Sequence, residues 1–316
     1  MKKSINRRTF LKLSSLAASS LYFDSNSFGM SMYHDEILNS RDDNYRFNLG
    51  GFECICFNDG GLDYKPSDFF KNVPTEELNE VLKKQKLPLD SIYTPYTHLF
   101  VNTGKHRILV DMGAGKVLPN NGNLPISMRS VGIEPEDIDT VFITHAHPDH
   151  IGGTLDDSGN LVYANAQYYI WKEEWDFWFS DSALEKTPEF FVKTAREQLN
   201  PIKDRVTFLE EESEVLPDIG VLFAPGHTPG HMVVVFAAGK EKLYYVADTV
   251  LYPLHLEYPD WVPIYDILPE IAALSKNRIF NLVAEEEALV IGQHFTPFPS
   301  LGKVVKKERG WLWVPS

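Results

Sequence analysis

The residues best suited to chemistry in this chain lie in one short segment, residues 141–153. His145, His147, Asp149 and His150 occur there within six positions, in the pattern His-x-His-x-Asp-His. Imidazole nitrogens and carboxylate oxygens are ligands for divalent metals such as zinc. Four such groups in one tight turn cannot all face a single tetrahedral ion. The spacing therefore favours two neighbouring ions, with His145 and His147 at one and Asp149 and His150 at the other.

The alternative for this segment is a polar surface loop in which histidines cluster without binding anything. The elements around the motif favour metal binding instead. Residues 141–144 are apolar or β-branched and predict a short buried strand. Pro148 and the pair Gly152 and Gly153 predict a turn directly after it. A buried strand that delivers ligands into a turn is the context that such a motif needs.

Three later strand-like segments also end in residues of ligand type. They are residues 221–224 before His227, residues 243–247 before Asp248, and residues 290–293 before His294. The recurrence predicts two βα-rich halves that face each other, with the metals at one edge. Asp111 ends another such strand and is predicted either to hold a ligating histidine or to cap a turn. His231 is expected to hydrogen-bond within its turn rather than to bind metal.

Composition limits the classes of function. The chain has 316 residues, of which 43% are hydrophobic and 23% charged, as in ordinary globular proteins. A formal net charge of −14 argues against a nucleic-acid-binding surface. No apolar run is long enough to predict a stable membrane span. Cys54 and Cys56 stand two apart in a strand-like run and are expected to be buried without a disulfide.

The N-terminus has the layout of an export signal. A basic segment containing Arg7 and Arg8 leads into a short, weakly apolar one. The arginine pair resembles a twin-arginine signal, and the alternative is an ordinary basic amphipathic helix. We therefore expect a signal peptide over residues 1–27, a linker over 28–44 and a single domain over 45–316. The twin-arginine export machinery would be a partner, and the protein would be periplasmic or secreted.

Local patterns predict the elements that carry these residues. We expect one or two strands over 47–57 ending in a turn at 58–61, and a helix over 74–86 capped by Thr75. We also expect a hairpin of 96–101 with 107–111, a helix over 189–199, a strand over 206–209 and a closing strand over 304–314. Aromatic residues near the motifs are candidates for the wall of a substrate pocket. They are Trp171, Trp175, Phe179, Tyr252 and Phe295.

These motifs resemble those of the metallo-β-lactamase superfamily of hydrolases, over nearly all of residues 45–316. The signature matches residues 145–150, and the methyl parathion hydrolase and lactonase-like branch is indicated by residues 52–61, 109–115 and 292–299. The resemblance implies an α/β fold, the four-layer αβ/βα sandwich. It also implies a ligand set. His145, His147 and His227 would hold one ion, Asp149, His150 and His294 would hold the other, and Asp248 would bridge them.

Two departures from related families narrow the expected substrate. True β-lactamases of this type use a cysteine at the second ion, and no cysteine follows Cys56. β-Lactamase activity is therefore not expected. Relatives of the parathion hydrolase often carry a histidine shortly after the bridging aspartate, where this chain has Leu251.

The predicted function is that of an exported dinuclear metal-dependent hydrolase. Two divalent ions, with zinc the expected metal, would share a hydroxide that attacks a lactone or other ester. Asp149 and Asp248 are the predicted catalytic carboxylates. An organophosphate triester is the alternative substrate. A non-catalytic metal-bearing binding protein and a thiol-linked oxidoreductase with a single iron are alternative classes. The sequence leaves the oligomeric state open, a dimer included.

Overall fold

The computed structural model describes residues 43–119 and 121–316. The predicted signal peptide and most of the predicted linker lie outside these residues. Within the described part of the chain, no helix combines the length and apolar character needed to cross a membrane.

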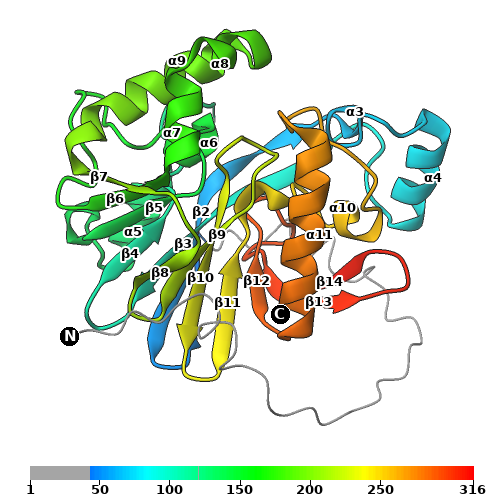
Figure 1. Cartoon of the computed structure of the whole chain (residues 1–316). Helices are drawn as coiled ribbons and strands as arrows, with labels where there is room; N and C mark the ends of the chain where they lie inside the picture. The colour runs from blue at the N-terminus through cyan, green and yellow to red at the C-terminus, as the bar shows by residue number, and fades with distance from the viewer. Residues whose placement is uncertain (1–42, 120) are drawn as a thin grey trace.

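Two seven-stranded sheets form the body of the protein (Figure 1). The first runs in the order β1 to β7 and the second in the order β14 to β8. The first sheet contains β1 (Asn44–Leu49), β2 (Phe52–Tyr64), β3 (Ile92–Asn102), β4 (Arg107–Val110), β5 (Thr140–Ile143), β6 (Gln167–Trp171) and β7 (Val206–Leu209). The second contains β8 (Ser213–Leu216), β9 (Ile219–Phe223), β10 (Met232–Ala238), β11 (Glu241–Tyr245), β12 (Leu289–Ile291), β13 (Leu301–Lys306) and β14 (Trp311–Pro315).

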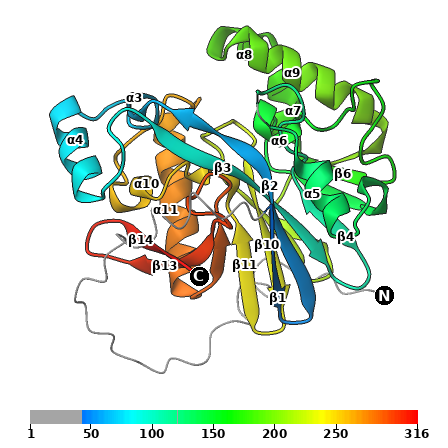
Figure 2. The ribbon, with the colours of Figure 1, turned by 180° about the vertical axis from the view of Figure 1, so that it is seen from behind.

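Helices cover the outer faces of both sheets (Figures 1 and 2). Those between β4 and β7 are α5 (Leu124–Ser130), α6 (Pro148–Ile151), α7 (Lys172–Phe179), α8 (Asp181–Lys186) and α9 (Glu189–Leu199), with the 3-10 turns η2 (Pro135–Asp137) and η3 (Asn200–Arg205). The others are α3 (Pro66–Phe69), α4 (Thr75–Lys84), η4 (Ala247–Thr249), α10 (Leu254–Glu257) and α11 (Pro269–Glu285). The long helix α11 lies against the second sheet, where Ile279, Phe280 and Val283 pack on its strands.

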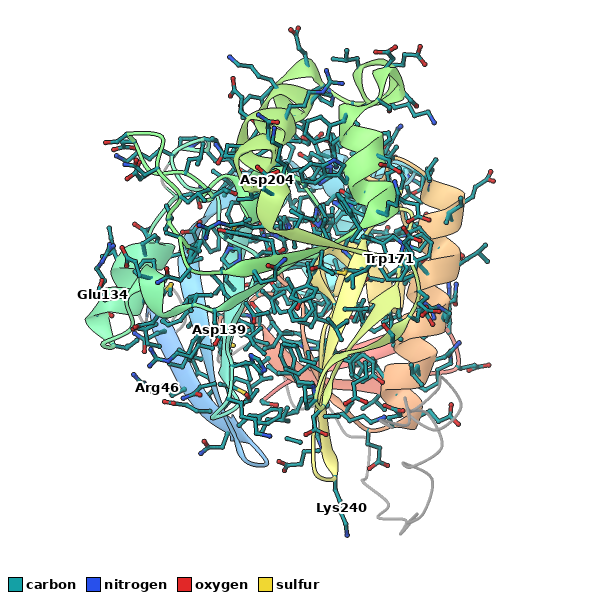
Figure 3. The ribbon with its side chains drawn as sticks, turned by 60° about the vertical axis from the view of Figure 1, so that its left-hand side comes forward. Arg46, Glu134, Asp139, Trp171, Asp204 and Lys240 are labelled. Carbon is teal, nitrogen blue, oxygen red and sulfur yellow. The ribbon has the colours of Figure 1, made fainter. Side chains whose placement is uncertain are left out.

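Three hydrophobic layers hold the sheets and the helices on them together, and a fourth hydrophobic cluster joins α3, α4 and α10. One lies between the first sheet and its helices, one between the two sheets, and one between the second sheet and α11. Cys54 and Cys56 lie in the middle layer as free, buried thiols, because alternate residues of β2 face the same side. Side chains fill this interior, whereas Lys240, between β10 and β11, projects away from it (Figure 3). The predicted four-layer αβ/βα sandwich is confirmed.

Several elements agree with the sequence patterns. The predicted helix over 189–199 and the strand over 206–209 are α9 and β7. The predicted hairpin is the antiparallel pair of β3 and β4.

Other local predictions were wrong. The expected turn at residues 58–61 is a bulge inside β2, which continues to Tyr64 because Asn58 and Gly61 both pair with β3. The closing strand over 304–314 is two strands, β13 and β14. Thr75 lies inside α4 and does not cap it, since Pro74 occupies the N-cap position. Neither α11 nor β10 was predicted.

Candidate metal centre

The central motif lies at the end of β5. Thr144 follows the strand, and the chain turns through His145 to His147 into the short helix α6, which carries Asp149 and His150. The loop after β4 lies directly against Gly153, where a Cβ atom would collide with the carbonyl oxygen of Met112. The glycine therefore permits the close approach of backbone that brings the two loops together.

The other three ligand candidates lie at the ends of strands in the second sheet. His227 follows β9, Asp248 lies in η4 after β11, and His294 follows β12. Ala247, just before Asp248, has a φ of 43°, a left-handed conformation that costs an alanine about 1–2 kcal/mol. Such strain persists only where surrounding contacts enforce it, and it often marks functional sites.

The structure brings the seven predicted ligand residues together in two groups that share Asp248. One consists of His145, His147, His227 and Asp248, and the other of Asp149, His150, His294 and Asp248. Within each group the potential ligand atoms lie within 4.8 Å of one another.

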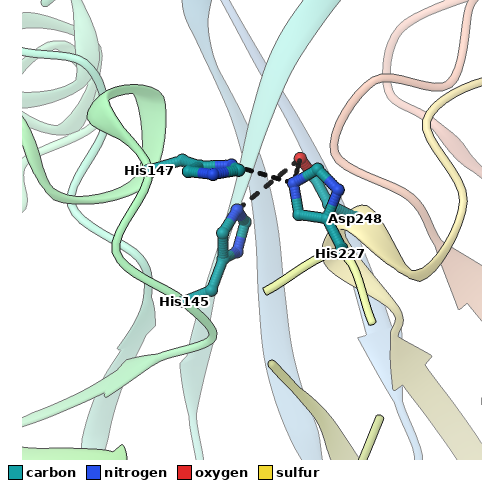
Figure 4. A group of neighbouring side chains, drawn as sticks. All are labelled: His145, His147, His227 and Asp248. Carbon is teal, nitrogen blue, oxygen red and sulfur yellow. Dashed lines mark hydrogen bonds and ion pairs between the residues drawn. The ribbon is translucent and has the colours of Figure 1, made fainter. Parts of the chain in front are cut away.

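The first group is compact and buried. The imidazoles of His145, His147 and His227 converge on the carboxylate of Asp248 (Figure 4). Nδ1 of His147 lies 2.9 Å from Nε2 of His227, which in turn lies 3.2 Å from Oδ2 of Asp248. Nε2 of His145 lies 3.7 Å from the same oxygen.

The second group surrounds the same carboxylate oxygen, and it too combines residues from the ends of strands in both sheets. Oδ2 of Asp248 lies 3.5 Å from Nε2 of His150 and 3.3 Å from Nε2 of His294. Nε2 of His294 also lies 3.3 Å from Oδ2 of Asp149. Among the described residues, Asp248 alone belongs to both groups, as a bridging carboxylate would.

Unpartnered atoms show that these residues fit two cations. Nε2 of His145, Nε2 of His150 and Oδ1 of Asp248 are buried and have no hydrogen-bond partner in the described part of the chain. Buried polar atoms without a partner are costly, and here they converge on the two groups. Nitrogen and oxygen donors in sets of four suit divalent ions, and zinc is the metal that this mixture favours.

The outward-facing nitrogens of four histidines have oxygen partners. Nδ1 of His150 lies 2.7 Å from Oδ2 of Asp111 and Nδ1 of His227 lies 3.0 Å from Oδ1 of Asp266. Nδ1 of His294 lies 3.3 Å from the carbonyl oxygen of Pro95, and Nδ1 of His145 lies 3.1 Å from the hydroxyl of Thr144. When each Nδ1 donates its hydrogen outward, each Nε2 offers a lone pair to the centre.

Asp111 holds a histidine of the metal centre, which is the first of the two roles predicted for it. Besides holding His150, it accepts hydrogen bonds from the backbone and hydroxyl of Thr144. Its φ of 61° is a left-handed conformation that aspartate tolerates better than most residues. Asp266 has the same role for His227. No sequence pattern predicted it.

Burial and neighbouring charges shift the pKa values of the groups at this centre in different directions. Burial, followed by neighbouring imidazoles, holds the pKa values of His145 and His147 well below the usual range, so both are neutral ligands. Burial raises the pKa of Asp248, but His294 and His150 outweigh it, and the net pKa is well below normal. The carboxylate is therefore ionised at neutral pH, which suits cation binding.

The other histidines of the described residues lie outside both groups. His231 accepts a hydrogen bond from the backbone N–H of Asp248, at 3.1 Å, and belongs to neither group. His98 is buried in β3. His255 is also buried and contacts the carbonyl oxygen of Phe69 at 2.8 Å. His106 is partly exposed beside Asp139. His34 lies outside the described residues.

A cavity of about 240 Å³ opens above the metal centre. Its lining includes His147, Asp149, His227, Asp248 and His294 from the two groups. The rest of its wall is mostly apolar or aromatic. These residues are Leu62, Tyr64, Phe69, Tyr96, Leu118, Pro148, Phe191, Leu251 and Tyr265.

The five aromatic residues predicted to line this pocket do not do so, and that prediction was wrong. Trp171 stacks on Phe223 in the layer between the sheets, and Phe295 packs on Trp313. The others pack elsewhere: Trp175 against Phe179 and Phe208, and Tyr252 against Phe69 and Phe70. The wall comes from segments far apart in the chain, among them β2, β3, α3 and α9, and local sequence patterns do not show that these segments meet.

Comparison with known proteins gives a family match. The model of the metallo-beta-lactamase superfamily matches residues 96–294. The N-acyl homoserine lactonase of Bacillus cereus is 26% identical over 183 residues, which are 57% of this chain and 66% of that enzyme. The match thus spans just under two thirds of the relative. An N-acyl homoserine lactonase of a Bacillus species is 26% identical over 204 residues, 64% of this chain and 71% of the enzyme.

Solved structures cover more of the chain. AidC, a dizinc quorum-quenching lactonase in complex with an N-acyl-homoserine product, is 31% identical with a TM-score of 0.81. The match covers 87% of this chain and 99% of AidC. The hydrolase AbOPH is 26% identical with a TM-score of 0.81, covering 87% of this chain and 97% of that one.

Metal binding should release protons and should strengthen as pH rises from neutrality to about 9. Burial lowers the pKa values of His227 and His294, but hydrogen bonds and charges of nearby aspartates raise both to about 9. Both imidazoles therefore carry a proton at neutral pH, which an ion must displace. Zinc titration calorimetry in two buffers of different ionisation enthalpy measures the released protons. Equal heats in both buffers would contradict this expectation.

Proposed function

The chain belongs to the metallo-β-lactamase superfamily, and from this premise we propose that it is a dinuclear lactonase acting on lactones that carry an acyl chain. The observation that carries the proposal is the position of the two groups sharing Asp248, at the floor of a largely apolar cavity. Apolar walls with a few convergent polar groups are typical of small-molecule sites.

The residues that line the cavity support an acyl-lactone substrate. Leu118, Phe191 and Leu251 provide apolar wall, against which a hydrocarbon chain loses its contact with water. Asp149, Asp248 and the histidines provide the polar floor, where the ester group would lie. The similarity to N-acyl homoserine lactonases and to AidC supports the same substrate class.

The residues of the two groups have different roles in hydrolysis. When bound, two divalent ions activate water at neutral pH and polarise an ester carbonyl. Asp248 holds the two groups at a fixed separation, because its Oδ2 contacts histidines from both. Asp149 lies in the cavity wall and accepts a hydrogen bond from Gln293 at 3.3 Å, which orients its carboxylate. Asp149 and Asp248 thereby act as the catalytic carboxylates.

Two tyrosine hydroxyls in the cavity wall supply a hydrogen bond to the substrate. The hydroxyls of Tyr64 and Tyr96 lie 2.5 Å apart, and within the described residues they bond only to each other. One proton serves that bond, so the second is available to the cavity. Tyr96 also packs edge-on against His294, at 5.2 Å between ring centroids. Burial and the charge of Asp149 raise the pKa of both tyrosines, which therefore stay protonated as donors.

The N-terminal segment supports export as part of this proposal. Its basic start and the pair Arg7 and Arg8 fit the twin-arginine route. The residues concerned lie outside the described part of the chain. Export of a folded protein would let the cytoplasm load the metal, and the hydrolase would then act in the periplasm or outside the cell.

A substrate panel tests the proposed activity. We expect acyl-lactones to be hydrolysed with a higher kcat/KM than phosphotriesters, the alternative predicted from sequence, or β-lactams. Asp248→Ala should abolish hydrolysis, because it removes the carboxylate common to both groups. Asp204→Ala, at an exposed site, is the control and should change nothing. Phosphotriester turnover exceeding lactone turnover would overturn the substrate assignment.

Tyr96→Phe should lower kcat/KM for the lactone by about 10- to 100-fold. A hydrogen bond to a group that gains charge contributes about 1.5–3 kcal/mol, and its loss affects kcat more than KM. Tyr168→Phe is the matched control, because its buried hydroxyl bonds to the carbonyl oxygen of Tyr163 far from the cavity. Steady-state kinetics measure both variants. Equal rates for Tyr96→Phe and the unmodified protein would exclude Tyr96 as the donor, and equal rates for Tyr64→Phe as well would exclude the role of the pair.

Replacing Arg7 and Arg8 together by lysine should retain the protein in the cytoplasm. The twin-arginine signal is read through its arginine pair, so a change that keeps charge should still block export. Cell fractionation of a bacterial host measures the distribution. Lys2→Arg with Lys3→Arg is the control that leaves the pair intact. Unimpaired export of the lysine variant would refute this route.

A further inference from the structure

Glu174 is a buried charged residue outside both metal groups. It lies in α7, its side chain is 0% exposed, and it does not line the cavity. A buried carboxylate is costly unless hydrogen bonds replace its contact with water. Glu174 accepts four such bonds, and their partners reveal what it does.

One oxygen of Glu174 holds the first ligand loop. Oε1 accepts a hydrogen bond from the backbone N–H of Ala146, at 2.9 Å, and from the indole N–H of Trp178, at 2.6 Å. Ala146 stands between His145 and His147, which belong to the first group. The contact therefore fixes the backbone from which both histidines project.

The other oxygen holds the second ligand loop. Oε2 accepts hydrogen bonds from the hydroxyl of Thr228, at 2.6 Å, and from the backbone N–H of Gly230, at 2.9 Å. Thr228 directly follows His227, the third histidine of the first group. A Cβ atom at Gly230 would collide with the backbone of Glu174, so this loop lies directly against the start of α7.

We propose that Glu174 is a positioning residue that links the two loops of the first group and sets its affinity for metal separately from that of the second. Two equivalent carboxylate oxygens allow one side chain to serve one loop each. Glutamine has a single acceptor oxygen, and its NH₂ group would face two donors at the other loop. The inference rests on the two-ion part of the proposed function, and it does not depend on which substrate is hydrolysed.

Glu174→Gln should therefore lower the affinity of the first group for its ion by about 10- to 100-fold. This is the usual effect of losing a residue that orients ligands. The affinity of the second group for its ion should fall much less, because none of Asp149, His150 and His294 contacts Glu174. If Glu174 contributed only to the stability of the fold, the affinities for both ions would fall alike.

Cadmium-113 NMR of the cadmium-loaded protein measures this difference. Each ion gives its own resonance, which coupling to the ring protons of His227 or His294 assigns. Titration against a competing chelator then gives the two affinities. Equal weakening of both ions, or of neither, would overturn the proposal. Because no substrate is used, a negative result here is distinct from failure of the proposed lactonase activity.

Asp111→Asn is the matched comparison, another change of a buried carboxylate to an amide. Asp111 contacts His150 directly and reaches His145 only through Thr144. Asp111→Asn should therefore lower the affinity for the second ion more than that for the first. This order is the reverse of the one expected for Glu174→Gln. The same order of effects in both variants would contradict the inference.

Two changes at Thr228 keep the test decisive if Glu174→Gln does not fold. Thr228→Val removes one donor to Oε2 and keeps the shape of the side chain. It should lower the affinity for the first ion and leave that for the second nearly unchanged. Thr228→Ser retains the hydroxyl and should keep the normal affinity. Identical affinities of these two variants would overturn the proposal.

Discussion

The rest of the structure depends on one buried carboxylate surrounded by imidazoles. Oδ2 of Asp248 lies 3.2–3.7 Å from a nitrogen of four histidines, two from each group. An ionised carboxylate at such a depth is unfavourable unless positive charge compensates it. The protein therefore brings the ends of strands from both sheets to one edge, where protons or metal ions supply that charge. The strained φ of Ala247 is a local cost of placing Asp248 there.

The sandwich provides the rigidity that this arrangement needs. Ligands on short turns after packed strands are held more exactly in place than ligands on long loops. Carboxylates outside the two groups complete the support: Asp111 and Asp266 hold histidine rings, and Glu174 holds backbone. The hydrophobic layers thus determine where the loops start, and buried hydrogen bonds determine where their side chains point.

Much of this could be predicted from sequence because the signals are local. The His-x-His-x-Asp-His pattern, the strand before it and the later strand ends that carry His227, Asp248 and His294 are visible within short windows. The same motifs predicted two facing βα-rich halves, and their resemblance to a known family implied the four-layer fold. The turn expected at residues 58–61 was wrong because tertiary pairing with β3 overrides the turn preference of Asn-Asp-Gly. The cavity wall and Glu174 escaped prediction because they depend on contacts between distant segments.

The central claim is that hydrolysis requires both groups and hence two ions. The most direct test is zinc titration into protein stripped of metal, with acyl-lactone hydrolysis measured after each addition. Activity should rise with zinc and reach its maximum at two ions per chain, because Asp248 belongs to both groups. Full activity at one ion per chain, or activity unaffected by removal of metal, would contradict the claim.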